Sequence, residues 1–261
     1  MKGALAEGSA EHPLVTVVTA VYNGKGDVAR CLESVLSQDY PSIEHIVMDG
    51  GSNDGTVEVL RQWDDRIALW RSEPDKGVYD AWNKALVEAR GEWICFLGVD
   101  DEFLPNAVSA YMALAARSPE AEYISSRVKW VHPSGYEKIF GEPWAWKRFS
   151  KSMRTAHVGS MHHRNLFDRL GKYDISYRFV ADYEFLLRAK NHLNADFLPV
   201  VTVTMKAGGV SDSRAALKER ARALVASGVR SKIFSEVELL VANAKFTLRP
   251  LKYVFRRLTS R

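Results

Sequence analysis

Residues 43–63 read IEHIVMDGGSNDGTVEVLRQW, and this stretch decides the class of fold. An apolar run typical of a buried strand ends at Asp49, glycines follow, and the spacing of Val57 and Leu60 then indicates a helix. A loop between a strand and a helix is a common place for a bound phosphate group. Here Asp49 and Asp54 would repel a phosphate, and the loop matches neither GxGxxG nor the lysine-bearing P-loop. The loop is therefore expected to contact another part of a ligand.

The first hundred residues repeat this alternation of strand and helix. Residues 14–20, LVTVVTA, form a continuous apolar and β-branched run, which is typical of a strand covered on both faces. The patterns predict strands at 14–20, 43–49, 67–73 and 92–101, with helices at 28–36, 56–63 and 77–90 between them. Strands separated by helices imply right-handed βαβ crossovers, so we expect an α/β fold with a parallel sheet.

The second half of the chain has a mixed pattern. We expect a helix at 106–118, a hairpin at 123–140, a helix at 182–192 and a late strand at 196–211. No internal repeat or low-complexity linker interrupts them. The expected organisation is a disordered N-terminus at 1–12, one domain at 13–210 divided into halves at 13–104 and 105–210, and a basic helical extension at 211–261.

Bulk composition fits a cytoplasmic globular protein. With 261 residues, 46% of them hydrophobic, the chain is long enough to bury a large core. No apolar run approaches the roughly 20 residues that span a bilayer, and the first dozen residues lack the apolar core of a signal peptide. Cys31 and Cys95 lack metal-ligand spacing and are interpreted as small buried hydrophobic residues, which suits a reducing compartment.

Positive charge is concentrated at the C-terminus. Residues 213–261 contain 12 Lys or Arg and 3 Asp or Glu, so their net charge is +9, whereas the remainder carries −5. Residues 250–261, PLKYVFRRLTSR, project as a helix with Leu251, Val254, Phe255 and Leu258 on one face and basic residues on the other. Such a helix is typical of docking on the anionic inner face of a membrane. Packing on the chain's own domain or on a second subunit remains the alternative.

The ends of the predicted parallel strands carry most of the candidate chemistry. Ligands of open α/β sheets bind beyond the carboxyl ends of the strands, where the strand order reverses. Six carboxylates are expected there: Asp49, Asp54, Asp75, Asp80, Asp100 and Asp101. Their mutual repulsion is costly unless a cation or hydrogen-bond donors hold them, which favours a divalent metal. Taken singly, Asp54 or the Asp100–Asp101 pair could equally cap a helix.

Five motifs in order resemble the family 2 glycosyltransferases of the GT-A fold, particularly those of bacterial exopolysaccharide and O-antigen assembly. They are VTVVTAVYNG, CLESVLSQDYPSIEHIVMDGGSNDGT, SEPDKGVYDAWNKAL, GEWICFLGVDD and ADYEFLLR, between about Leu14 and about Gly209. The resemblance implies a Rossmann-like, mostly parallel sheet flanked by helices, with a mixed second half. It also implies transfer of a sugar from a UDP- or GDP-linked donor to an acceptor hydroxyl with inversion, as a hexosyltransferase does. The acceptor would be a glycan, most simply a lipid-linked intermediate of surface polysaccharide assembly.

Carried over position by position, the resemblance gives 13–104 the nucleotide-sugar-binding role and 105–210 the acceptor-binding role. The donor residues implied are Thr19, Val21 and Tyr22 along the nucleotide base, Asp49 and Gly50 at the base, Asp75 and Lys76 near the ribose and diphosphate, Asp80 and Asn83 on the following helix, and Asp100 at sugar hydroxyls. Asp101 would ligate Mg²⁺ or Mn²⁺ that bridges the diphosphate. The sequence departs from a strict DxD motif because Gly98 stands at the first Asp position.

The resemblance also implies the catalytic base. Asp182 in ADYEF matches the family's carboxylate, with Ala181 where a Glu usually precedes it and Glu184 as the fallback. A useful base is ionised yet partly desolvated, which raises its pKa. Asp182 could instead only cap its helix. His157 is a candidate for contact with donor phosphate or acceptor, against a packed or solvated histidine.

Two other functions remain open at this stage. Gly98 and Ala181 also fit a catalytically inactive scaffold or regulatory subunit that binds nucleotide sugar. A nucleotidyltransferase of related topology is disfavoured because no glycine-rich, Arg- or Lys-bearing loop lies near the N-terminus. A nucleic-acid partner is not expected, because the basic residues belong to no recognised nucleic-acid module. The sequence leaves open whether the protein is a homo-oligomer.

Overall fold

The computed structural model describes residues 7–9, 11–208 and 213–259, with backbone alone for residue 245 and for 248–259. Nine strands in these ranges form one sheet in the order β3-β2-β1-β4-β8-β6-β9-β5, with β7 paired to β6. The strands are β1 (Val15–Val21), β2 (Ile43–Asp49), β3 (Leu69–Ser72), β4 (Trp93–Gly98), β5 (Glu102–Phe103), β6 (Tyr123–Val131), β7 (Glu137–Phe140), β8 (Ser160–His163) and β9 (Ala195–Lys206).

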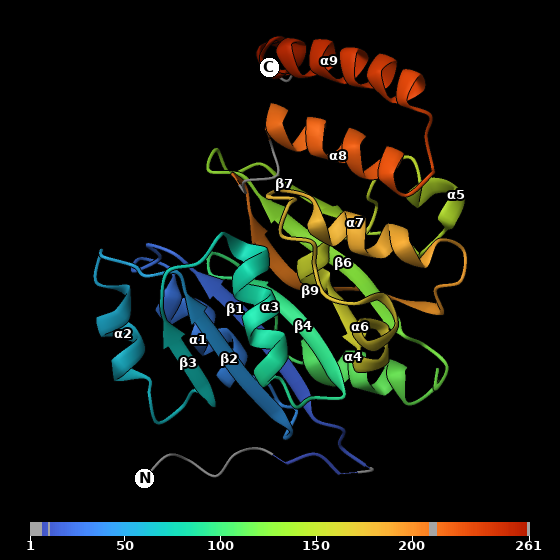
Figure 1. The fold of residues 1–261 in the computed structure, drawn as a ribbon. Coiled ribbons are helices and arrows are strands. Elements are labelled where there is room, and N and C mark those ends of the chain that lie inside the picture. The colour runs from blue at the N-terminus through green and yellow to red at the C-terminus, as the bar shows by residue number, and fades with distance from the viewer. Residues whose placement is uncertain (1–6, 10, 209–212, 260–261) are drawn as a thin grey trace.

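Helices cover both faces of this sheet (Figure 1). They are α1 (Val28–Leu36), α2 (Thr56–Gln62), α3 (Val78–Glu88), α4 (Ala107–Ala115), α5 (Trp146–Phe149), α6 (Arg164–Leu170), α7 (Ala181–Ala189), α8 (Arg214–Ala226) and α9 (Lys232–Thr259). One core cluster joins α3, α6 and α7 to the sheet, and others join α1, α2 and α4 to it. Both faces of the sheet are therefore buried, as the continuous apolar strands predicted.

The parallel half of the sheet is confirmed. β1 lies between β2 and β4, and β3 is parallel to β2 at the edge. The first strand, β1, therefore lies in the middle of the parallel half. Strands β2 and β3 follow on one side of it, and β4 lies on its other side. The strand order reverses between β1 and β4, which is the place where open α/β sheets bind ligands.

The second half is mixed, as expected. The predicted hairpin is present, since β6 and β7 pair antiparallel with Val131 opposite Glu137. Two short strands have no clear sequence signal: β8, which pairs antiparallel with both β4 and β6, and β5, which pairs with β9. The late strand ends at Lys206, and residues 209–211 of the prediction lie outside the described residues.

Helix α7 lies against the upper part of the sheet, and α8 and α9 follow above it (Figure 1). The C-terminal extension is helical as predicted, with α9 reaching Thr259, although the side-chain faces predicted for 250–261 lie outside the described side chains. In the described ranges no helix combines the length and apolar composition that crossing a bilayer demands. At the N-terminus, residues 7–9, 11 and 12 form neither helix nor strand. The domain boundaries remain predictions.

Both cysteines are buried and free, as interpreted from the sequence. Cys31 lies on the buried stripe of α1, and Cys95 lies in β4. Burial raises the pKa of the Cys31 thiol to about 12, so it remains protonated and unreactive at neutral pH.

A buried carboxylate fixes the start of the parallel sheet. Glu44 in β2 is 3% exposed and accepts hydrogen bonds from the Thr16 hydroxyl at 2.5 Å and from the Gly91 backbone N–H at 3.1 Å. The Arg90 guanidinium completes the group at 2.9 Å. One side chain therefore joins β1, β2 and the turn before β4.

We expect Glu44→Ala to lower the free energy of unfolding by about 3 kcal/mol, because it removes a buried acceptor shared by the Thr16 hydroxyl and the Gly91 backbone N–H. Urea denaturation measures the loss. The matched control is Glu58→Ala, which removes only an exposed pair with Arg61 and is expected to cost under about 0.5 kcal/mol. Equal stability of the two variants would show that Glu44 does not join the strands energetically.

Candidate active site

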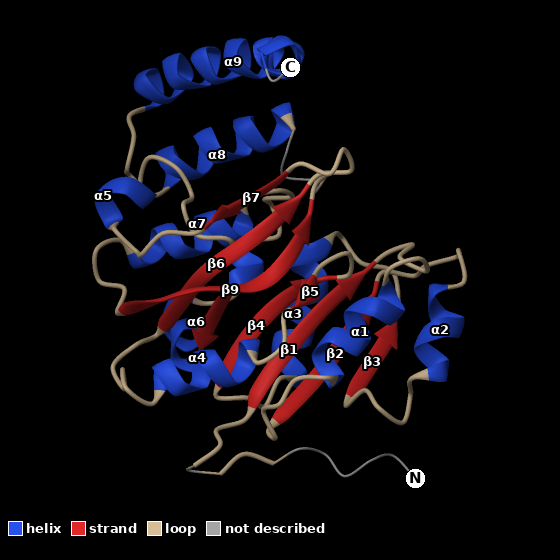
Figure 2. Cartoon of the chain, turned by 180° about the vertical axis from the view of Figure 1, so that it is seen from behind, coloured by secondary structure: helices blue, strands red, loops and turns tan. Residues whose placement is uncertain are grey.

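The carboxyl ends of the parallel strands meet on one edge of the sheet. In the register, Ala20 of β1 lies opposite Gly98 of β4, and Val21 lies opposite Asp49 of β2. Asp49 in turn lies opposite Ser72 of β3. The arrowheads of β1, β2 and β3 point toward the same edge in Figure 2. The loops that the sequence singled out are therefore brought together.

Asp49 shapes the loop that follows it. Its carboxylate is 2% exposed and accepts hydrogen bonds from the Gly51 and Ser52 backbone N–H groups at 3.1 and 3.0 Å. The Ser52 and Ser72 hydroxyls donate to it as well, at 2.5 and 2.6 Å. Four donors thus stabilise its negative charge. Contact between Asp49 and a nucleotide base stays a prediction, and the structure adds an internal role.

The rest of this loop is tied to its neighbours. A Cβ on Gly50 would lie 2.6 Å from the Asp75 Oδ2, so glycine lets that carboxylate approach. Asp54 accepts from the backbone N–H of Thr56 at the start of α2 and from that of Lys25. Hydrogen bonding, chiefly from the Thr56 hydroxyl, lowers the pKa of Asp54. Asp54 therefore binds the first residue of α2, although Gly55 and not Asp54 is the N-cap residue of that helix.

The segment after β1 offers one side chain to solvent. Tyr22 is 65% exposed, whereas Thr19 is fully buried and its hydroxyl lies 2.9 Å from the His45 Nε2. Val21 is 3% exposed and packs in the core. Of these three predicted donor residues, only Tyr22 places its side chain where a nucleotide base could stack.

The loop before α3 and the first turns of that helix carry four of the predicted donor residues. Asp75 accepts from the Gly77 backbone N–H at 2.7 Å, and Lys76 is exposed. Asp80 accepts from the Lys76 backbone N–H at 3.0 Å. Asn83 exchanges two hydrogen bonds with the backbone of Tyr173, at 2.8 and 3.0 Å. Asp80 and Asn83 therefore have structural partners, and their contact with a donor stays a prediction.

Asp101 is a buried carboxylate in unfavourable surroundings. It is 5% exposed and accepts a hydrogen bond from the Lys206 backbone N–H at 3.1 Å. Burial, then the charge of Asp100, raises its pKa to about 8. A Cβ on Gly98 would lie 2.6 Å from the Asp101 Oδ2 and 3.1 Å from the Asp100 Oδ1. Glycine at this position therefore leaves room for both carboxylates.

This arrangement fits a cation held jointly with a ligand. Across the described residues, no group of three or more His, Cys, Asp or Glu side chains is arranged to hold a metal ion. Mg²⁺ is commonly bound by only one or two carboxylates together with substrate phosphates and water. The pair Asp100 and Asp101 matches that pattern, and a positive charge there would offset the burial and the repulsion from Asp100 that raise the Asp101 pKa.

Asp182 lies in the first turn of α7, next to the first turn of α3. Its carboxyl accepts a hydrogen bond from the Tyr79 hydroxyl at 2.9 Å. Burial raises the pKa of Asp182, and this hydrogen bond and nearby backbone N–H groups of its own helix offset part of the rise. Tyr79 lies two residues after the Asp75–Gly77 loop, so the contact joins α7 to the edge of the sheet where the predicted donor residues lie. Its environment is that of a desolvated yet ionisable base.

Glu184 has a different environment. The Arg188 guanidinium holds its carboxylate with three hydrogen bonds, at 2.9, 3.1 and 2.5 Å. Arg188 also donates to the Leu170 and Lys172 carbonyl oxygens. Glu184 thus anchors α7 to the end of α6, which leaves Asp182 as the better placed base. Ala181 is fully buried, so a small residue fits at that position.

His157 lies within an aromatic cluster. Its ring stacks on Phe96 with a centroid distance of 5.0 Å and lies 4.8 Å from the Trp82 ring. Burial lowers the pKa of His157 to about 3, so the ring is neutral at physiological pH. Contact with a phosphate as a cation is therefore disfavoured, and the packed alternative describes the observed environment.

Comparison with known proteins decides the family. Residues 16–167 match the model described as Glycosyl transferase family 2. The chain belongs to this family. An uncharacterized glycosyltransferase of Mycobacterium tuberculosis is 35% identical over 182 residues, 68% of this chain and 69% of that protein. A PGL/p-HBAD biosynthesis glycosyltransferase of Mycobacterium bovis is 26% identical over 208 residues, 77% of this chain and 80% of that protein.

Solved structures show that this family 2 glycosyltransferase has the GT-A fold. Staphylococcus aureus TarS in complex with UDP-GlcNAc superposes with a TM-score of 0.68 at 17% identity, covering 90% of this chain and 73% of that one. The mannosyltransferase PcManGT of Pyrobaculum calidifontis, in complex with GDP-Man and Mn²⁺, gives a TM-score of 0.64 at 22% identity. That superposition covers 93% of this chain and 74% of PcManGT.

Two contributors to the site of this glycosyltransferase were missed by sequence reasoning. Tyr79 lies 103 positions from Asp182, and Lys206 reaches Asp101 through its backbone N–H across 105 positions. Nearly any residue can donate through its backbone N–H, so the residue type at position 206 gives no indication of this contact. Only the place of Tyr79 beside the Asp75–Gly77 loop could have indicated that it lies near the site.

Substituting Asp101 is expected to stabilise the protein in the absence of metal. The pKa of Asp101 is about 8 in the folded protein and about 4 in an unfolded chain. Folding therefore takes up a proton between these values, and the stability contributed by this group falls as the pH rises from about 4 to about 8. Asp101→Asn removes the penalty and should raise the Tm at pH 8 by at least about 3 °C.

Calorimetry in a chelating buffer measures this effect, which should shrink toward pH 5. Asp168→Asn, an exposed substitution on α6, is the control and should leave the Tm unchanged. A lower Tm for Asp101→Asn than for the wild type at pH 8 would contradict the electrostatic reading of the site.

Proposed function

We propose that the protein is an inverting, metal-dependent glycosyltransferase. It would move a sugar from a nucleotide diphosphate donor to an acceptor hydroxyl. The observation that carries the proposal is the enclosed Asp182 carboxyl, held by Tyr79 at 2.9 Å beside the loops that end the parallel strands. Family membership supports the transfer reaction, and the environment of Asp182 supports a single-displacement mechanism with one base.

The donor is expected at the point where the strand order reverses. Exposed Tyr22 would stack on the nucleotide base, while Gly50 and Gly51 would allow the backbone to approach it. UDP-GlcNAc in TarS and GDP-Man in PcManGT support a UDP- or GDP-linked sugar. Asp101 would hold Mg²⁺ or Mn²⁺, which when bound would offset the negative charge of the departing diphosphate, and Asp100 beside it would bind sugar hydroxyls. Mn²⁺ in PcManGT supports this choice.

The chemistry assigned to this chain is proton removal. As the acceptor oxygen attacks the anomeric carbon, Asp182 accepts its proton, and the bond from that carbon to the diphosphate breaks on the opposite side. The pair of electrons leaves with the diphosphate, so the configuration at the anomeric carbon inverts. Tyr79 orients Asp182 and favours its ionised form, because its hydroxyl donates to the carboxylate and offsets part of the rise in pKa that burial causes.

The acceptor is proposed to be a lipid-linked glycan of surface polysaccharide assembly, used at the inner face of the membrane. The support is the resemblance of the motifs to exopolysaccharide and O-antigen enzymes, and the basic C-terminal segment of net charge +9. The alternative is a scaffold that binds nucleotide sugar without transferring it.

Asp182→Asn should lower kcat/KM for sugar transfer by about 10³-fold, because an amide cannot accept the proton. The assay follows release of UDP or GDP in the presence of acceptor. Asp168→Asn on the exposed side of α6 is the control and should retain wild-type activity. Nucleotide binding should survive in both variants. Full activity of Asp182→Asn would refute the assignment of the base, and a wild type that binds nucleotide sugar but transfers none would favour the scaffold.

Tyr79→Phe tests the positioning of the base. The Tyr79 hydroxyl lowers the pKa of Asp182, so its removal should raise that pKa further. The acidic limb of the pH profile of kcat/KM should therefore move to higher pH, while activity well above this limb changes little. An acidic limb at the wild-type position, with activity lost equally at every pH, would indicate a merely structural role for Tyr79.

A further inference from the structure

Helix α9 presents an apolar face to solvent. Ile233, Phe234, Val237, Leu240 and Val241 are between 48% and 78% exposed. Their spacing of three and four residues places them on one side of the helix. The sequence continues this periodicity through Phe255 and Leu258, within the segment predicted to be amphipathic. A contiguous exposed apolar face of this kind marks an interaction site.

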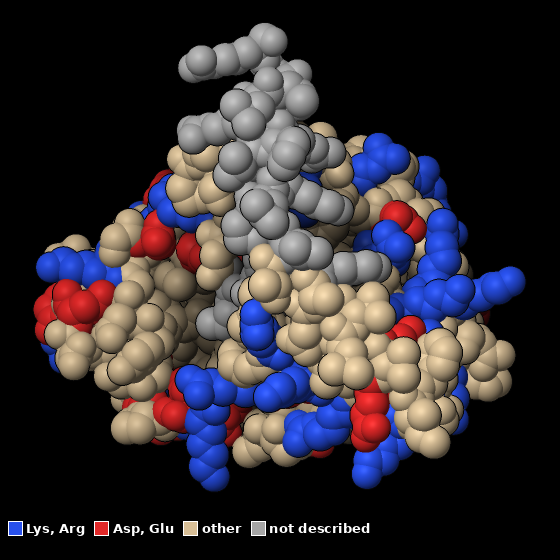
Figure 3. Space-filling model, turned by 90° about the horizontal axis from the view of Figure 1, so that it is seen from above, with Lys and Arg blue, Asp and Glu red and all other residues tan. Residues whose placement is uncertain are grey.

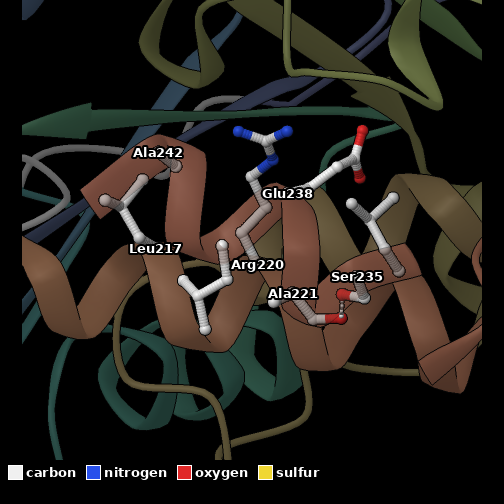
Figure 4. Close-up of a pocket in the computed structure, with 8 residues that line it drawn as sticks. Leu217, Arg220, Ala221, Ser235, Glu238 and Ala242 are labelled. Atoms are coloured by element: carbon white, nitrogen blue, oxygen red, sulfur yellow. Dashed lines mark hydrogen bonds between the residues drawn. The ribbon is translucent and has the colours of Figure 1, made fainter. Parts of the chain in front are cut away.

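The opposite side of α9 is fixed to α8, so the apolar face points outward. Ser235 is 4% exposed, and its hydroxyl donates to the Ala221 carbonyl oxygen at 3.1 Å (Figure 4). A cavity of about 20 Å³ between the helices is lined by Leu217 and Leu224 of α8 and by Leu239 and Ala242 of α9. The helices pack closely around this cavity, which has room for about one water molecule.

Helix α8 is in turn held to the catalytic body. Glu219 accepts from the backbone N–H groups of Arg178 and Phe179 at 2.8 and 2.7 Å, directly before α7. The Arg222 guanidinium lies 3.8 Å from the centre of the Tyr177 ring and donates to the Ser176 carbonyl oxygen. The exposed face of α9 therefore has a fixed orientation relative to the helix that carries Asp182.

Charge indicates the kind of surface that this face meets. Within the described part of α8 and α9, the exposed charged residues are Arg214, Lys218, Arg222 and Lys232 against Glu236. Figure 3, which looks down on this side, shows Lys and Arg gathered along its lower and right margins. Two copies meeting through α9 would bring together segments of net charge +9. These charges favour an anionic partner. Because the face itself is apolar, the partner must also offer an apolar region in which its side chains can be buried.

We propose that the outer face of α9 docks on an anionic lipid surface. Ile233, Phe234, Val237, Leu240 and Val241 enter the boundary between head groups and acyl chains, while basic residues of the segment meet the lipid phosphates. The proposal deepens the proposed function and rests on it for the lipid-linked acceptor. Through α8, docking holds the Asp182 end of α7 in one orientation toward the membrane that carries that acceptor.

The test is co-sedimentation of the full chain with vesicles, without donor or acceptor. The expected result is binding to equal parts phosphatidylglycerol and phosphatidylcholine, weakened by salt, and little binding to phosphatidylcholine alone. Ile233→Ser/Leu240→Ser should weaken binding by at least about 10-fold. Val237→Ser/Val241→Ser on the same face provides a second pair in case the first does not fold.

The matched control is Val87→Ser/Ile139→Ser, which removes two equally exposed apolar side chains elsewhere and should bind like the wild type. The proposal is overturned if the wild type ignores anionic vesicles, or if both α9 pairs bind as tightly as the control. It is also overturned if light scattering shows a dimer that the α9 substitutions dissociate, since a second copy then covers the face.

Transfer to a soluble acceptor analogue, measured in parallel, separates the two proposals. If the docking proposal is wrong, the wild type still transfers sugar to the soluble analogue. If the proposed transferase reaction is wrong, the wild type still binds anionic vesicles.

Discussion

Crowding of carboxylates at the carboxyl ends of four parallel strands is the constraint on which the rest of this structure depends. The register brings Asp49 to the same edge as Gly98, and Asp101 follows one turn later. Buried carboxylates at one edge of a sheet are tolerated only where hydrogen-bond donors or cations surround them. The buried strands β1 and β4 hold these loops in place, and the Glu44 contacts join the strands at the opposite end of the sheet.

The protein solves this constraint in two ways. Asp49 and Asp54 are satisfied internally, by hydroxyl and backbone donors that fix the glycine-rich loop. Asp101 is stabilised less: burial and the charge of Asp100 outweigh its backbone hydrogen bonds and raise its pKa to about 8. Such a residue costs stability, which is common where a group is reserved for a ligand. The acidic loop at 49–56 is therefore held by its own hydrogen bonds beside the candidate site, and Asp101 is the carboxylate whose ionised form is disfavoured.

The order of strands and helices in the first half could be predicted from the sequence, whereas contacts between residues far apart in the chain could not. Strand, loop and helix alternate in the first hundred residues because hydrophobic periodicity records which faces are buried, so β1 to β4 and their helices were predicted. The four residues of β8 have no such pattern, because pairing with β4 and β6 stabilises them. The sequence also did not predict the direction of side chains. Thr19 and Val21 belong to a motif segment, but both side chains are buried in the core. The contact between Tyr79 and Asp182 spans 103 positions and leaves no local trace.

The affinity for Mn²⁺ with and without nucleotide, measured by electron paramagnetic resonance, tests the central claim most directly. The described side chains supply too few ligands for a metal site of protein groups alone. Mn²⁺ should therefore bind at least about 10-fold more tightly when UDP or GDP is present, because diphosphate oxygens complete its coordination beside Asp101. Equal affinity without nucleotide, or unchanged nucleotide-dependent binding in Asp101→Asn, would contradict the claim that these carboxylates are reserved for a metal-bound nucleotide sugar.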